Sequence, residues 1–320
     1  MSRERDWASR VSQRLGIGHS LHPCLFSGSA PDGPPEFATG SLGGSYCTET
    51  PAMPFSFLAS GLRHRHLILR LTRARLEARY RDTWLGWLWL PAVPLLLLGV
   101  YTFVFSQVFH ARWDTVPGQG NAPFALMLFC GLTLYGLVAQ CVNEAPSLLV
   151  AYQSYLKQLL FPSEILAWVC VLTAVVPLGV SLLLLLIVYG VMVGPPPISS
   201  LLLPFTVVPL ILLTLGTVWF LSSLGVFLRD LSHASAVFTS ALLFLSPVFY
   251  PASRVPEALR GWFELNPLTP VLEAARRSLF EGQLPLDWGP LSVATGVGLL
   301  VSWGGYAWFM RTKGTFVDVL

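Results

Sequence analysis

Six long runs of uncharged residues constrain the fold of this chain more than any other feature. An α-helix rises about 1.5 Å per residue, so about 20 apolar residues cross the ~30 Å hydrocarbon core of a bilayer. Only 12% of the 320 residues are charged, whereas soluble domains carry about a quarter of their residues as charges. We therefore predict an all-α integral membrane protein with six transmembrane helices, at residues 84–109, 122–143, 165–194, 201–228, 234–250 and 288–310.

The third and fourth runs form one uncharged stretch from 165 to 228, which is too long for a single crossing. Three consecutive prolines, Pro195, Pro196 and Pro197, interrupt this stretch. Proline lacks the amide hydrogen that an interior helix position needs. We therefore predict two spans joined by a tight turn at these prolines.

Basic residues beside the runs predict the orientation, because cytoplasmic loops carry an excess of Lys and Arg. Five basic residues lie on one side: Arg112, Arg254, Arg260, Arg276 and Arg277. Eleven lie on the other: Arg63, Arg65, Arg70, Arg73, Arg75, Arg79, Arg81, Lys157, Arg229, Arg311 and Lys313. We predict a multi-pass membrane protein with both termini in the cytoplasm. This placement also accounts for the net charge of +3, so no nucleic-acid partner is predicted.

The two ends of the chain differ from the apolar runs. Residues 1–55 are rich in Gly, Ser and Pro and contain no apolar stretch long enough for a signal sequence. We predict that they form a disordered cytoplasmic tail, and Met53 is an alternative start of the chain. Residues 312–320 are predicted to form a short cytoplasmic C-terminus.

A basic segment, residues 56–82, precedes the first run. Within it Leu62, Leu69 and Leu76 recur every seven residues, which is typical of one face of a helix. Arginine side chains can extend toward lipid headgroups. We predict an interfacial helix that contacts membrane lipids, and the alternative is that the arginines only fix the topology.

Two connections are more than simple turns. Residues 144–164 place apolar side chains at helical spacing before Pro162, which predicts a helix along the cytoplasmic face of the membrane. Residues 251–287, on the far side, predict two short amphipathic helices broken at Asn266-Pro267. Each of these is too short and too charged to span the bilayer.

Catalytic motifs are missing from the sequence. It contains no phosphate-binding GxxxxGK[ST] loop, no HExxH and no GxSxG. The five cysteines have no metal-site spacing, and the six runs carry none of the charges that ion-coupled transporters place inside the membrane. We predict no catalytic residue, no metal site and no cofactor, so ATP for any uphill transport is bound by a partner chain.

Five segments, in order along the chain, carry a resemblance to a known family. They are RYRDTWLGWLWLPAVPLLLLGVYTFVF, LKQLLFPSEIL, FLRDLSH, LSPVFYP and LNPLTPVLEAARRSLFEG. With these segments, the chain from about Arg63 onward resembles the permease subunit of type-2 ABC exporters, in the branch that moves O-antigen, capsular polysaccharide or teichoic acid, which implies a location in the bacterial inner membrane. Family members often read LKKVYFPREILP where this chain has Gln158, Ser163 and Ala167 in place of two basic residues and a proline.

The resemblance implies a homodimer that binds two copies of an ABC nucleotide-binding subunit and passes a lipid-linked polysaccharide between its protomers. It also implies that a coupling helix at 147–160 docks in the ATPase; the alternative is a helix that only covers lipid headgroups. The candidate ATPase-coupling residues are Tyr152, Lys157, Phe161 and Glu164.

Aromatic residues near the predicted interfaces have two possible roles. Most such residues anchor membrane proteins at headgroup depth, but some could line the channel and stack on sugar rings. The candidates for channel lining are Tyr101, Phe105, Tyr135, Phe249 and Tyr250. Residues 255–280 resemble the re-entrant exit-gate helices of the family, with Trp262, Phe263 and Asn266 as gate candidates; the alternative is a loose interfacial lid.

Two other functions remain open. One is a type-2 ABC exporter whose cargo is a drug or a lipid. The other is a membrane enzyme that acts on a polyprenyl-linked sugar, which requires carboxylates or histidines arranged as a site. The candidates for such a site are isolated residues that interface roles explain equally well: Asp82, Glu144, Glu164, Asp230 and His233.

Overall fold

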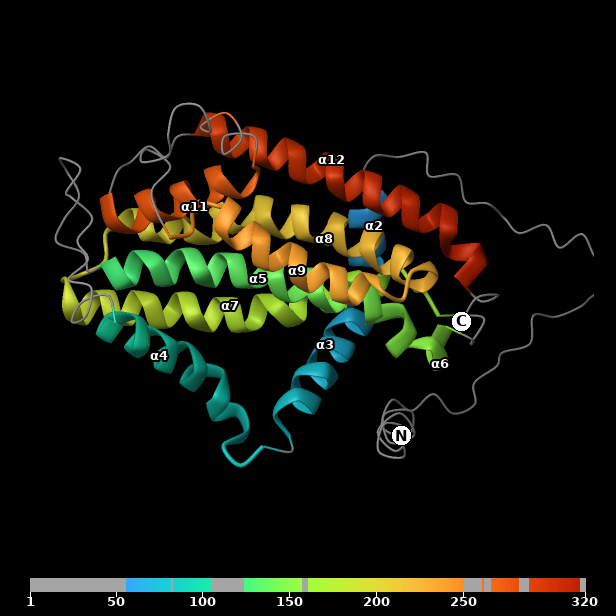
Figure 1. The fold of residues 1–320 in the computed structure, drawn as a ribbon, viewed down its shortest axis with the longest axis horizontal. Helices are drawn as coiled ribbons and strands as arrows, with labels where there is room; N and C mark the ends of the chain where they lie inside the picture. The colour runs from blue at the N-terminus through green and yellow to red at the C-terminus, as the bar shows by residue number, and fades with distance from the viewer. Residues whose placement is uncertain are drawn as a thin grey trace, which may run out of the picture. The chain divides into compact units, whose positions relative to one another are not determined.

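The computed structural model describes residues 56–81, 83–104, 124–156, 161–249, 261, 266–281 and 288–316 (Figure 1). These residues form helices and turns without any strand, which confirms the all-α prediction. The predicted tail at 1–55 lies outside the described residues. The main helices are α2 (Ser56–Arg63), α3 (Arg65–Tyr80), α4 (Trp89–Thr102), α5 (Phe124–Ala151), α6 (Gln153–Leu156), α7 (Ile165–Met192), α8 (Leu203–Phe227), α9 (Leu231–Leu245), α11 (Leu268–Arg276) and α12 (Trp288–Thr312).

Four described helices are long and apolar enough to cross a membrane. They are Phe124–Ala151, Ile165–Met192, Ile198–Phe227 and Trp288–Thr315, and each corresponds to one of the predicted spans. The remaining two runs form shorter apolar helices, Gly86–Thr102 and Leu231–Leu245. The structure therefore supports a multi-pass helical membrane protein.

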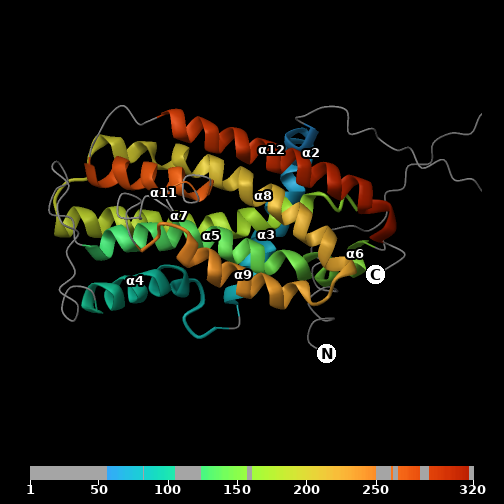
Figure 2. The ribbon, with the colours of Figure 1, turned by 45° about the horizontal axis from the view of Figure 1, so that its top comes forward.

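Helix α8 lies at the centre of the bundle, packed against α5, α7 and α12 (Figures 1 and 2). Its Trp219 is completely buried. The indole ring contacts Phe57 of α2, Trp168 of α7 and Tyr306 of α12, with ring centroids 6.1, 6.2 and 5.2 Å away. One aromatic side chain thus joins four helices that are distant in the sequence.

The predicted turn at the three prolines is confirmed. Helix α7 ends at Met192, and Gly194 follows with a backbone φ of +132°, a conformation that favours glycine. The prolines come next, and the chain returns through a 3₁₀ turn, Ile198–Leu202, into α8. Helices α7 and α8 then pack against each other.

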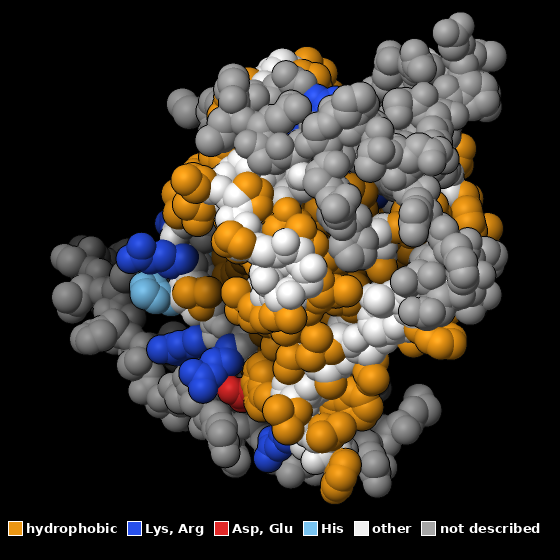
Figure 3. Space-filling view, turned by 90° about the vertical axis from the view of Figure 1, so that its left-hand side faces the viewer, with side chains coloured by type: hydrophobic (Ala, Val, Ile, Leu, Met, Phe, Trp, Pro, Cys, Tyr) orange, Lys and Arg blue, Asp and Glu red, His pale blue; other side chains and the backbone are white. Residues whose placement is uncertain are grey.

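The basic segment at 56–82 forms two helices, because α2 and α3 are separated at His64. Of the three leucines at seven-residue spacing, Leu62 and Leu69 are 71% and 59% exposed whereas Leu76 is buried, and lipid contact by this segment stays a prediction. The face that packs on α7 includes Ile68 and Leu71. Helix α3 carries five arginines, and Lys and Arg side chains gather on one flank in Figure 3, where most other described side chains are hydrophobic.

Candidate functional site

The predicted coupling helix does not begin where the sequence placed it. Helix α5 continues without interruption to Ala151, so a separate helix starting at Ser147 is wrong over residues 147–151. Leu148 and Leu149 are buried in the main core, which favours continuation of the helix. A short helix, α6, follows, and residues 157–160, including the candidate Lys157, lie outside the described residues. We call residues 152–164 the coupling segment.

The coupling segment is fixed in the bundle at both ends. Tyr152 at its start is only 8% exposed and belongs to the main core. Phe161 near its end is half-buried and packs against both the main core and the smaller cluster between α3 and α7. The described parts of the segment are therefore packed against the bundle at Tyr152 and Phe161.

Glu164 closes the segment just before α7 and is held by two other helices. Its backbone carbonyl accepts a hydrogen bond from the Trp219 indole N–H at 3.0 Å. Its carboxylate pairs with the Nζ of Lys313 at 2.7 Å, beyond the end of α12, and the Glu164 side chain is only 13% exposed. This position makes Glu164 an anchor of the segment in the described structure.

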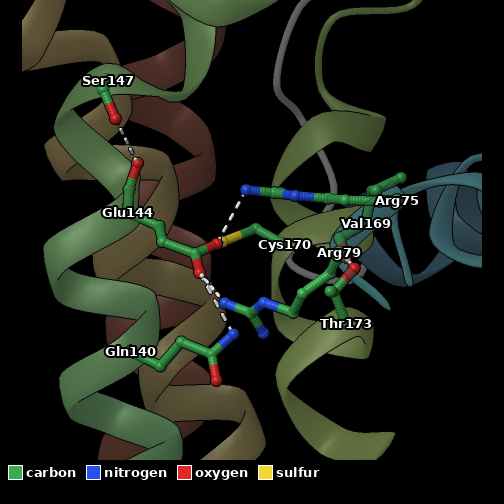
Figure 4. Close-up of polar contacts among 8 residues, drawn as sticks. All are labelled: Arg75, Arg79, Gln140, Glu144, Ser147, Val169, Cys170 and Thr173. Carbon is green, nitrogen blue, oxygen red and sulfur yellow. Dashed lines mark hydrogen bonds and ion pairs between the residues drawn. The ribbon is translucent and has the colours of Figure 1, made fainter. Parts of the chain in front are cut away.

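Glu144 has a role that sequence reasoning missed, because it was treated as an isolated interface residue. Its Oε2 lies 2.7 Å from Arg75 Nη2 and its Oε1 lies 3.0 Å from Arg79 Nη2 (Figure 4). Gln140 donates a further hydrogen bond to Oε1 at 3.1 Å, and the Cys170 thiol lies 4.0 Å from Oε2. A single carboxylate thus connects α3 with α5 and lies beside α7.

Helix α11 starts at the predicted break, directly after Asn266-Pro267. The Asn266 Oδ1 accepts a hydrogen bond at 3.0 Å from the backbone N–H of Leu268, two residues on, as in an Asx-turn. Its Nδ2 donates to Ser246 Oγ at 3.0 Å. Asn266 therefore links the start of α11 to the end of α9, whereas the other two gate candidates, Trp262 and Phe263, lie outside the described residues.

Arg276, which was counted as a loop residue that marks topology, lies buried inside the bundle. Its side chain is 7% exposed. It donates hydrogen bonds to the backbone carbonyls of Pro247 at 2.7 Å and Val248 at 2.5 Å, just beyond α9. Gly131 of α5 provides the space, because a Cβ there would lie 2.6 Å from Arg276 Nη2. The guanidinium thus fastens α11 to the end of α9.

The aromatic channel candidates occupy different environments. Tyr135 is buried, and its hydroxyl donates a hydrogen bond to the Thr239 carbonyl of α9. Tyr101 is half-buried against the core, and the half-buried Phe249 stacks on Phe244 with ring centroids 5.6 Å apart. The other two candidates, Phe105 and Tyr250, lie outside the described residues. Channel lining by these residues stays a prediction.

Comparison with known proteins now identifies the family. The family model described as ABC-2 type transporter matches residues 66–280, which is more than half of the chain. The chain belongs to the ABC-2 type transporter family. The match extends from α3 through α11, so it includes the coupling segment, the Glu144 ion pairs and the Arg276 contacts.

Individual relatives agree with the family assignment. The O-antigen export system permease protein RfbA of Myxococcus xanthus is 29% identical over 259 residues, which are 80% of this chain and 95% of that protein. Two proteins of the same name from Klebsiella pneumoniae are 23% and 24% identical, each over 79% of this chain and 95% of the relative. The resemblance inferred from the five segments is thereby confirmed, and an ABC-2 permease is expected to pair with an ABC ATP-binding subunit.

Proposed function

We propose that this chain is the membrane subunit of an ATP-driven exporter that passes a cell-surface polysaccharide outward across the bacterial inner membrane. The observation that carries the proposal is the extent of the similarity. It covers 95% of each of three proteins named as O-antigen export permeases, so it is not limited to one shared module. The coupling segment, fixed at both ends, supplies a route by which a partner ATPase can act on the bundle.

The proposed topology has six spans. Helices α4 and α9 supply the two spans that are shorter than the rest, and α11 is a re-entrant helix between the fifth and sixth spans. The eleven basic residues on one side of the spans support a topology with both termini in the cytoplasm. The end of the bundle that carries the coupling segment then faces the partner ATPase.

The proposed assembly is a homodimer with two ATP-binding subunits, and the cargo is a lipid-linked polysaccharide. Helices α4 and α9 expose large apolar side chains, including Leu96 at 63% and Val237 at 71%, as α7 and α12 also do, and in the proposed assembly the second protomer and membrane lipid together cover these surfaces. In this assembly ATP hydrolysis takes place on the partner, and the permease itself contributes no catalytic group or cofactor.

A bulky substitution in α6 is expected to weaken docking of the ATPase. Gln153 and Ser154 are exposed, so Ser154→Trp enlarges the coupling segment without disturbing the core. We expect at least about ten-fold less ATPase to co-purify with the tagged Ser154→Trp chain in mild detergent, since central interface residues contribute about 2 kcal/mol or more. The same strain should lose its surface polysaccharide, measured by gel staining.

Thr315→Trp is the matched control, because Thr315 is also an exposed hydroxyl residue but lies beyond α12. It should retain the ATPase and the surface polysaccharide. A wild-type chain that captures no ATP-binding subunit would contradict the exporter and favour the membrane enzyme. An assembled complex whose deletion leaves the surface polysaccharide intact would contradict the cargo alone and favour a drug or a lipid.

A further inference from the structure

Helix α3 contacts the two helices that flank the coupling segment, α5 by ion pairs and α7 by apolar packing. Near the segment's start, Arg75 and Arg79 bind Glu144, two turns before the end of α5. Near its end, Ile68 and Leu71 of α3 pack with Ile165 and Val169 in the first turns of α7. A movement of the segment that shifts either α5 or α7 must therefore also move α3 or break one of these contacts.

The ionic contact is what ties α3 to α5. Arg75 and Arg79 lie one helical turn apart and share one carboxylate, so without Glu144 two like charges would face each other. The side chains of Arg75 and Glu144 are each 24% exposed, so water screens this pair only partly. Burial of the Arg75 guanidinium lowers its pKa. Electrostatic interactions with Cys170, Glu144 and Tyr152 outweigh this effect, so the pKa of Arg75 is raised from its ordinary value.

Helix α3 also leads directly to the first apolar helix. Tyr80, its last residue, contacts Trp87 with ring centroids 5.6 Å apart. Trp87 lies in the 3₁₀ turn Gly86–Leu88, which runs straight into α4. The sequence of contacts therefore runs from the coupling segment through Glu144 to α3 and then through Tyr80 to α4.

We propose that Glu144, held between Arg75 and Arg79, is a positioning residue that passes movement of the coupling segment to α3 and from there to α4. The inference rests on the proposed function, because it requires an ATPase that moves the segment. Coupling between distant sites needs a structural element whose conformational equilibrium is shifted by both sites. Here that element is α3, and the Glu144 carboxylate is its attachment to the driven end of α5.

Hydrogen exchange in the complete permease–ATPase complex tests this role. Exchange is measured by mass spectrometry without nucleotide and with a non-hydrolysable ATP analogue. In the wild type we expect nucleotide to change exchange in the coupling segment, α3 and α4. In Glu144→Gln the response of the coupling segment should remain, while the responses of α3 and α4 should fall about two- to thirty-fold. Export per ATP hydrolysed should fall in the same variant.

Glu77→Gln is the matched control. Glu77 pairs with Arg73 at 2.8 Å on the same helix, but both side chains are well exposed and the pair connects α3 only to itself. This variant should respond to nucleotide as the wild type does. If Glu144→Gln fails to assemble, Arg79→Gln replaces it, because it removes the more exposed arginine and retains the shorter Arg75 pair.

The outcomes separate this inference from the proposed function. A wild-type chain that binds no ATPase would overturn both. A wild-type response confined to the coupling segment, or an undiminished α3 and α4 response in Glu144→Gln and Arg79→Gln, would overturn only the role of Glu144. A purely structural role predicts lower yield of the complex with an unchanged nucleotide response in the molecules that assemble.

Discussion

Gly305→Val is expected to separate α12 from α8 and to abolish the folded protein. The two helices meet at glycines: a Cβ on Gly305 would overlap the backbone carbonyl of Gly216, and a Cβ on Gly216 would overlap that of Val301. Membrane helices gain much of their association energy from such close backbone approach. Because backbone atoms cannot move aside as a flexible side chain can, we expect a loss of more than about 4 kcal/mol.

Gly304→Val provides an adjacent control, since a Cβ on Gly304 would meet nothing within 4 Å. The measurement is the yield of monodisperse protein in mild detergent, followed by the midpoint of thermal unfolding. Gly304→Val should behave like the wild type, and Gly305→Val should give little monodisperse protein. Equal yields and midpoints for the two variants would show that the α8–α12 contact does not depend on this close approach.

The apolar helices were predictable because their signals are local. A run of about 20 uncharged residues and a break at three prolines depend only on neighbouring residues, and the structure places α7, α8 and the turn between them as expected. The α3 face that packs on α7 was not predictable in this way. Ile68 and Leu71 form it because they meet Ile165 and Val169 of α7, which are far away in the sequence.

The predicted span ends at residue 143 because Glu144 is the first charged residue after the uncharged run, whereas α5 continues to Ala151. In the structure the charge of Glu144 is balanced by Arg75 and Arg79, which are 69 and 65 residues earlier in the sequence. The helix therefore continues past it. A local sequence pattern cannot reveal an opposite charge that only the tertiary fold brings near. For the same reason, the sequence did not indicate Glu144 and its arginine partners as a candidate site.

Two adjacent arginines show the same limit at the other end of the bundle. In the sequence, Arg276 and Arg277 count equally as basic residues that indicate the orientation of the membrane spans. In the structure Arg276 is buried, whereas the Arg277 side chain is 41% exposed and lies 3.8 Å from Glu273. The difference comes from the backbone after α9, where the carbonyls of Pro247 and Val248 accept hydrogen bonds from Arg276.

Arg276→Met should therefore destabilise the protein by about 3 kcal/mol or more, because each hydrogen bond to a charged group contributes about 1.5–3 kcal/mol and two carbonyls lose their donor. Methionine retains much of the apolar volume, so the loss reports mainly on these hydrogen bonds. Arg276→Lys should be intermediate, since an ammonium group retains the charge but lacks the two-pronged geometry of a guanidinium. The measurement is the midpoint of thermal unfolding in detergent.

Arg277→Met is the neighbouring control, and its expected effect is about 0–1 kcal/mol because partly exposed ion pairs contribute little.

The pair of variants also bears on the proposed exit gate. Arg276, the last residue of α11, connects that helix to the residues just after α9, so its loss should release the end of α11 from them as well as lower stability. Faster hydrogen exchange in α11 and the last turns of α9 in Arg276→Met, but not in Arg277→Met, is the expected result. Equal midpoints and equal exchange in the two variants would mean that the buried guanidinium does not hold α11 against α9.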